Sequence, residues 1–156
     1  MRRDSKLSSI LHVLLHMAHI NRPLTSEELA EYLDTNPVLV RRVLAGLRSR
    51  GYVSSEKGHG GGWSIACDLH AVTLRDIYDA VGSPTIFAMG NRTETPGCLV
   101  EQAVNESLDT AFHDAEALLI ERLNSITLAD LSANFTRHFA THPRRTNAHA
   151  HQLEHE

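Results

Sequence analysis

The 156-residue chain has little of several features that define common protein classes. No apolar run approaches the roughly 18 residues that a membrane span needs, so we expect no membrane partner. The two cysteines, Cys67 and Cys98, cannot build a disulfide framework, which favours a reducing compartment, the cytoplasm. The segment after the basic start is interrupted by histidines and ends in no small-residue cleavage site, so we expect no signal peptide.

Catalytic motifs are missing as well. The sequence contains no G-x-S-x-G, no H-E-x-x-H and no Cys–His pair of a known catalytic spacing. Among the eleven histidines, the pairs His12/His16 and His138/His142 are four residues apart, but no cysteine or acid joins them at the spacing of zinc ligands. We therefore expect no enzyme, no metal site and no cofactor.

The net charge of −4 conceals an asymmetry between two parts of the chain. Residues 1–62 carry nine Lys or Arg and six Asp or Glu, a charge of +3, whereas residues 63–156 carry six and thirteen, a charge of −7. Between residues 37 and 59 there are five basic residues and a single acid. Because a polyanion responds to the local field, this part of the chain suits a nucleic acid.

Apolar spacing and capping residues predict a mainly α protein with one small β-hairpin. Helices are expected over residues 5–20, from 25 or 26 to 33, and at 37–50, 74–81 and 99–124. A short helix is expected to start at 127. Two runs of β-favouring residues flank the glycine-rich segment 57–62, which is typical of a hairpin.

The order of these elements predicts a winged helix-turn-helix domain. It would span residues 1–82, followed by a loop at 83–98, a long-helix region at 99–135 and a polar, histidine-rich, disordered tail at 136–156. The third helix places arginines outside its apolar stripe, and a basic glycine-rich tip follows at once, as a recognition helix and wing require. Taken alone, the arginines are equally typical of a solvated face. The glycines also resemble a phosphate-binding loop, but Trp63 follows them where such a loop has lysine.

The stretch LVRRVLAGLRSRGYVSSEKGHGGGWSIA at residues 39–66 resembles the core signature of the Rrf-type winged-helix repressors. This is the family of IscR, NsrR, CymR and the YwnA-like proteins. VTLRDIYDAV at 72–81 and SITLADL at 125–131 resemble two further motifs of that family. The resemblance covers about residues 5–135. It implies a homodimeric transcriptional regulator, mostly a repressor, that binds a pseudo-palindromic operator in double-stranded DNA. It also implies that the region at 99–135 is a dimerisation helix region.

The resemblance also indicates which residues contact DNA. The base-reading positions of the family fall on Val38, Arg41 and Arg42, and its wing-tip arginine falls on Lys57. Cluster-bearing members have acidic or amide residues in place of Arg41 and Arg42, so the operator cannot be copied from them. Since arginine prefers guanine edges, we expect at least one G·C pair to be read in each half-site. Arg48, His59 and Ser26 complete the predicted DNA-binding set, Ser26 as a donor to phosphate.

The sensing mechanism is open at the level of sequence. Many relatives hold an iron–sulfur cluster with three cysteines in the loop before the long helix, where this chain has only Cys98. We therefore predict no cluster. Cys98 precedes a helix N-terminus, a position that lowers a thiol pKa, so it is a candidate redox switch; an idle cysteine is the alternative. A small-molecule effector in the cleft between the two domains also stays open.

An alternative hypothesis, from a different functional class, is that the chain is a protein-interaction module that binds a partner enzyme through its acidic half. The salt dependence of DNA affinity discriminates between the two, since only a DNA binder releases counterions from phosphates.

Overall fold

The structure is a computed structural model that describes residues 6–86 and 97–141, with side chains up to 138. Parts of the predicted loop (87–96) and of the predicted tail (142–156) lie outside the described residues. The elements are α1 (Lys6–His19), α2 (Ser26–Leu33), α3 (Pro37–Ser49), β1 (Val53–Glu56), β2 (Gly62–Ile65), α4 (Leu74–Ala80), α5 (Leu99–Asn124) and α6 (Leu128–Thr141). The mainly helical fold with a single hairpin confirms the predicted fold class.

The helix-turn-helix corner is set by local capping. Thr25 begins α2 with a capping box: its hydroxyl accepts from the Glu28 N–H at 3.2 Å, and the Glu28 carboxylate accepts from the Thr25 N–H at 2.7 Å. Asn36 caps α3 through the Val38 N–H, and Pro37 is the first helical residue. Three residues separate the two helices, so their relative orientation is tightly constrained.

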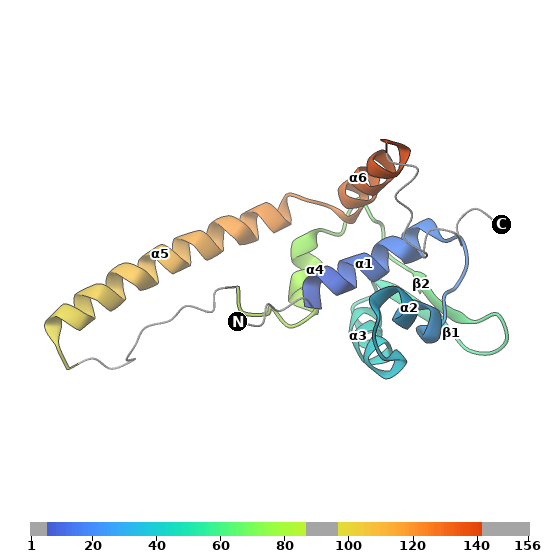
Figure 1. Cartoon of the computed structure of the whole chain (residues 1–156), viewed down its shortest axis with the longest axis horizontal. Helices are drawn as coiled ribbons and strands as arrows, with labels where there is room; N and C mark the ends of the chain where they lie inside the picture. Colours follow the sequence, from blue (N-terminus) through green and yellow to red (C-terminus); the bar gives the residue numbers. More distant parts are fainter. Residues whose placement is uncertain (1–5, 87–96, 142–156) are drawn as a thin grey trace.

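One hydrophobic core holds the winged-helix elements together. Leu14 of α1, Leu29 of α2, Leu44 and Leu47 of α3 and Ile77 of α4 are at most 2% exposed. Burying five such side chains contributes on the order of 2 kcal/mol each. In Figure 1 these helices and the hairpin form the rounded body at the right.

The hairpin is fastened to the chain between α1 and α2. β1 and β2 pair antiparallel with Ser55 opposite Trp63, and Trp63 also exchanges backbone hydrogen bonds with Leu24 at 2.7 and 3.0 Å. A Cβ on residue 62 would lie 2.6 Å from the Leu24 carbonyl oxygen, so this close approach needs Gly62. The wing therefore cannot swing freely from the body.

The motifs at 72–81 and 125–131 pair with each other. Thr73 and Thr127 lie opposite one another in a β-bridge; the Leu74 N–H donates to the Ile126 carbonyl at 2.8 Å, and the Leu128 N–H donates to the Val72 carbonyl at 2.9 Å. Each threonine also opens a helix with a capping box, to Asp76 in α4 and to Asp130 in α6. The repeated T-L-x-D pattern thus ties the start of α6 to the winged-helix domain.

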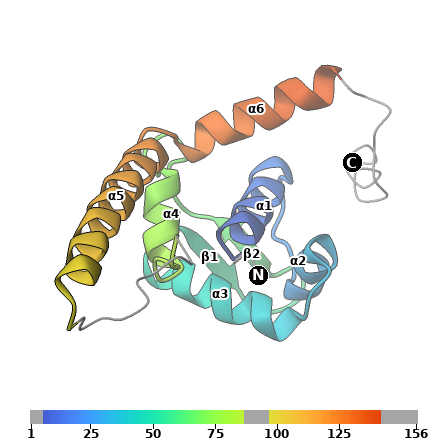
Figure 2. The same cartoon turned by 60° about the vertical axis from the view of Figure 1, so that its left-hand side comes forward.

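Two regions differ in their attachment to this body. α6 lies over α1 and continues to Thr141, so residues 136–141 are helical and the predicted tail boundary at 135 is too early (Figure 2). α6 is anchored on α1 just before this extension: Ser132 and Phe135 pack on His19, with a 3.1 Å hydrogen bond and a ring separation of 4.8 Å. α5 instead extends away from the body and buries none of its side chains (Figure 1).

No helix in the described ranges is both long and apolar enough to cross a bilayer.

Candidate nucleic-acid interface

α3 buries one face and exposes the other. Its apolar stripe of Val40, Leu44 and Leu47 packs into the core. Because successive residues are about 100° apart on a helix, the side opposite this stripe can be read from the sequence. That outward side consists of Val38, Arg42, Ala45 and Ser49. Val38 is 57% exposed there, so the first turn of α3 presents an apolar side chain to solvent beside an arginine.

Arg42 is exposed, and its guanidinium makes no hydrogen bond or ion pair to other described residues. All its N–H donors are therefore available to an incoming acceptor. An arginine of this kind can take both acceptors of a guanine edge at once. Among the predicted base-reading residues, Arg42 has the geometry that fits the role most directly.

Arg41 lies on the flank of α3 that faces α2. Its guanidinium forms an ion pair and hydrogen bond with the Glu27 carboxylate in the first turn of α2. Both side chains are exposed, so the pair contributes little to stability. The pair does, however, orient the remaining guanidinium N–H groups of Arg41. Glu27 is therefore a neighbour of the candidate interface, whereas the sequence indicated only that it is an acid in the first turn of a helix.

Arg48 faces the wing. Its Nη1 donates to the Ser55 hydroxyl of β1 at 2.7 Å, and its guanidinium carbon lies 5.7 Å from the centre of the Trp63 ring. These contacts connect the last turn of α3 with both strands of the hairpin. The predicted contact between Arg48 and DNA stays a prediction; the structure adds a role in holding the wing against α3.

Ser26, the first residue of α2, is 6% exposed, and its hydroxyl oxygen accepts from the Trp63 indole N–H at 3.0 Å. This hydrogen bond satisfies a buried donor. The hydroxyl keeps one proton of its own, so the predicted phosphate contact depends on that single group and stays a prediction. The bond itself was not predictable from local pattern, because 37 residues separate its partners.

Lys57 and His59 are exposed in the turn between β1 and β2. This turn projects from the body on the side away from α5 (Figure 1). A cation at such a tip can approach a phosphate backbone or a minor groove without desolvating the core.

α5 carries a different kind of surface. Val104, Leu108, Ala115 and Leu119 recur along one side of the helix, and none of them is buried. Leu99, at 80% exposed, and Leu118, at 69%, are among the most exposed large apolar side chains described. We call the first four residues the α5 stripe. Apolar area of this extent on a helix marks an interaction surface.

The two cysteines lie in different settings. Cys98 is exposed at the N-cap of α5, and the backbone N–H groups of Glu101 and Val100 lower the pKa of its thiol. Cys67 is partly buried after β2, and that burial raises the pKa of its thiol. Cys98 is therefore the thiol with the more reactive surroundings.

Packing within the chain accounts in part for the His12/His16 pair of α1. His16 stacks on Tyr32 of α2 with ring centres 4.2 Å apart, and its Nε2 lies 2.9 Å from that of His12. Within residues 6–86 and 97–138, no three His, Cys, Asp or Glu side chains gather as a metal site.

Comparison with known proteins decides the family. The profile of the Rrf2 family, described as iron-dependent transcriptional regulators, matches residues 3–134. The chain belongs to the Rrf2 family. This confirms the predicted resemblance and, since this is a family of regulators, the expectation that the protein is not an enzyme.

Individual relatives agree with this membership. YwnA of Bacillus subtilis, named as an HTH-type transcriptional regulator, is 27% identical over 128 residues, which cover 82% of this chain and 95% of YwnA. A crystal structure of a protein from Lactobacillus plantarum, described as a transcriptional regulator, is 28% identical, with a TM-score of 0.71 over 93% of this chain and all of that one. IscR of T. potens is 18% identical and shares the fold, with a TM-score of 0.65 over 97% and 96% of the two chains.

This Rrf2 protein is accordingly a DNA-binding transcriptional regulator. Its helix-turn-helix and wing are the elements that place Val38, Arg42 and Lys57 on accessible surfaces. Sequence reasoning missed the residues that support them: Glu27 against Arg41, and Trp63 between Ser26 and Arg48. For the contacts of Trp63 with Ser26 and Arg48, the only signal in the sequence was an isolated tryptophan after three glycines.

Proposed function

We propose that the chain is a homodimeric, sequence-specific repressor, with α3 in the major groove and the wing tip at the adjacent minor groove. The observation that carries this proposal is the outward side of α3, where the unpaired Arg42 lies beside the exposed Val38. Arg42 would read a guanine edge, and Val38 would meet a thymine methyl group. The Lys57 ammonium and His59 at the wing tip would contact the backbone or minor groove.

The α5 stripe supports the homodimer. A helix of 26 residues with no fully buried side chain has apolar area left for a second copy. Two-fold symmetry would place two α3 helices on one face of DNA, so the operator would be pseudo-palindromic, with half-sites about one helical turn apart.

We further propose that this regulator works without an iron–sulfur cluster, although its family is described as iron-dependent. Such clusters are held by several thiolates, and the sequence has two cysteines in unlike settings. The donor set does not fit a cluster of that kind. Reconstitution with iron and sulfide should yield no stoichiometric cluster absorbance, and a stoichiometric spectrum would contradict the proposal.

The salt dependence of DNA affinity tests the core of the proposal. Each phosphate contacted contributes about −0.9 to the slope of log affinity against log salt, so a repressor dimer should show a steep negative slope. A flat slope with no sequence preference would favour the interaction module that binds a partner protein.

A second candidate function, a thiol switch, is favoured by the exposure and lowered pKa of Cys98. Peroxide treatment should then change operator affinity in the wild type and leave Cys98→Ser unchanged. Equal affinity of reduced and oxidised wild-type protein would remove the switch and keep the repressor.

A further inference from the structure

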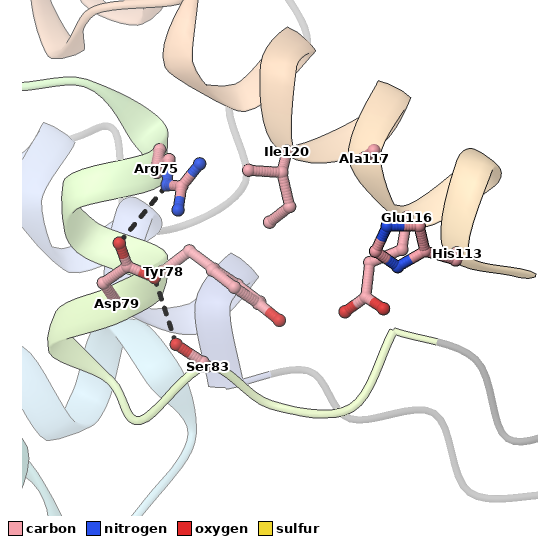
Figure 3. A pocket seen from close by; sticks show the side chains of 8 residues that line it. All are labelled: Arg75, Tyr78, Asp79, Ser83, His113, Glu116, Ala117 and Ile120. Carbon is pink, nitrogen blue, oxygen red and sulfur yellow. Dashed lines mark hydrogen bonds and ion pairs between the residues drawn. The ribbon is translucent and has the colours of Figure 1, made fainter.

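A cavity of ≈ 360 Å³ lies between α4 of the winged-helix domain and the C-terminal half of α5 (Figure 3). This volume is near the lower end of the range, about 300–1,000 Å³, in which small-molecule sites fall. Its lining is Arg75, Tyr78, Asp79, Ser83, His113, Glu116, Ala117 and Ile120. The four α5 residues are spaced i, i+3, i+4, i+7, so they share one side of that helix.

On the α4 side, several polar groups already have partners. The Arg75 Nε lies 3.4 Å from the Asp79 carboxylate, which also accepts from the Ser83 hydroxyl at 3.1 Å. Tyr78 donates its hydroxyl proton to the Pro84 carbonyl at 2.8 Å. Burial and, after it, the negative charge of Glu116 raise the pKa of Tyr78, which keeps this phenol protonated. These groups form the structural wall of the cavity.

Two groups on facing helices can still form hydrogen bonds in the cavity: the terminal N–H groups of Arg75 and the carboxylate of Glu116. The terminal nitrogens of Arg75 point into the cavity, away from the Nε that approaches Asp79, and the Glu116 carboxylate points toward Tyr78 from the opposite helix (Figure 3). The Arg75 guanidinium is ion-paired with Asp79 through its Nε, and Glu116 has no ion-pair partner among the described residues. They face the same space but do not pair with each other. Apolar surface from Ala117 and Ile120 lies on the α5 wall.

We propose that this cavity binds a small α-amino acid, with its carboxylate on the terminal N–H groups of Arg75 and its ammonium on Glu116. A planar guanidinium matches a carboxylate with two parallel hydrogen bonds, and a carboxylate accepts from an ammonium. Ala117, Ile120 and the Tyr78 ring would contact the side chain of the ligand. A zwitterion offers an acceptor to the remaining N–H groups of Arg75 and a donor to Glu116, whereas a ligand with only one of these charges engages one side of the cavity.

The position of the cavity makes the ligand a regulator of DNA binding, a step that rests on the proposed function. The α5 stripe lies about half a turn from the cavity side of the helix, so a ligand would leave the dimer surface free. α5 is held to the winged-helix domain at α4 and through the Thr73–Thr127 bridge. A ligand that joins α4 to α5 therefore sets the angle between the recognition helix and the two-fold axis, and with it the half-site spacing.

Binding is measured first without DNA, by calorimetry and thermal unfolding with each of the twenty standard amino acids. At least one should bind saturably and raise the Tm, as any ligand of the native state does. Its N-acetyl and amide derivatives, which each lack one charge, should bind at least about tenfold more weakly. Arg75→Gln and Glu116→Gln should each lose about 10- to 100-fold in affinity. Glu121→Gln, on α5 outside the cavity, should bind like the wild type.

Absence of saturable binding by every amino acid would overturn the proposal, as would wild-type affinity in both cavity variants. The regulatory step is tested separately, by operator affinity with and without the amino acid that binds. A ligand effect present in the wild type and absent in Glu116→Gln supports the coupling. Amino-acid binding without any DNA binding would refute the proposed function and leave the site in place.

Discussion

α3 and α5 use their apolar residues in opposite ways. α3 buries Val40, Leu44 and Leu47 in its own chain and leaves Arg42 outside, whereas α5 exposes its stripe and has no fully buried side chain. The surface of α3 is therefore complete in one copy and suited to a charged, hydrated partner. The surface of α5 is incomplete in one copy and suited to another apolar surface.

This difference separates specificity from assembly. DNA recognition would depend on a few polar groups on a rigid body, and the affinity for an operator would depend on α5 joining two such bodies. Variants in the two regions should therefore fail differently, the first in sequence preference and the second in oligomeric state.

The largest effect is expected from Leu108→Asp in the α5 stripe. An unpaired charge buried at the dimer contact costs about 3–5 kcal/mol, which weakens a dimer by roughly 100-fold or more. Sedimentation should show monomers, operator binding should fall with the dimer, and the helical circular dichroism of the folded domain should remain.

Thr110→Asp is the matched control, because it adds the same charge on α5 outside the stripe and loses only a hydrogen bond to the Glu106 carbonyl. It should remain dimeric. A dimeric Leu108→Asp protein with wild-type operator affinity would show that α5 is not the assembly surface.

Arg42→Ala should give the next largest effect. Loss of a bidentate contact to guanine costs about 1–3 kcal/mol and relaxes preference at one base pair of each half-site. Lys57→Ala, at the wing tip, should instead weaken all sequences alike, as a phosphate contact does. Binding measured on a set of single-base operator variants distinguishes the two, and unchanged preference in Arg42→Ala would remove that residue from the reading set.

Glu27→Gln should have a smaller effect, of a few-fold. Without its ion-pair partner the Arg41 guanidinium samples more orientations, and one negative charge near the phosphates is gone. Affinity for random DNA should rise while discrimination at the base pair near Arg41 falls. A variant with the wild-type ratio of specific to random binding would show that Glu27 does not position Arg41.

The smallest effect concerns the contact between α1 and α6. Burial lowers the pKa of His19 below its ordinary value, so the folded state holds this ring neutral. Its contribution to stability is present above the unfolded pKa near 6.5 and is lost as pH falls through the lower folded pKa. Between pH 7.5 and 5.5 the Tm should fall more in the wild type than in His19→Gln. An equal fall in both proteins would mean that other groups cause the pH dependence of the Tm.

Much of the fold was predictable because its signals are local. Thr25 and Asn36 cap helices through residues two or three positions away, and α5 runs from Leu99 to Asn124 as its apolar spacing indicated. The structured region was predicted to end at 135, whereas α6 continues to Thr141. The contact of Phe135 with His19, which anchors α6, joins residues more than a hundred positions apart and so left no local signal.

The candidate site divides along the same line. Periodicity places Val38 and Arg42 on the outward side of α3, so both were predictable. The partners of Arg41, Arg48 and Ser26 were not, since each is fixed by tertiary contact: Glu27 across the helix-turn-helix, and the wing residues Ser55 and Trp63 across the hairpin. Sequence thus predicts which face would bind DNA, and the structure shows which side chains of that face already have partners within the chain.

Selection of bound DNA from a random pool, at near-physiological salt, shows whether two copies of α3 and the wing read one operator. We expect an enriched pseudo-palindrome with at least one G·C pair in each half-site and half-sites about one helical turn apart. A pool that yields no shared motif would contradict it.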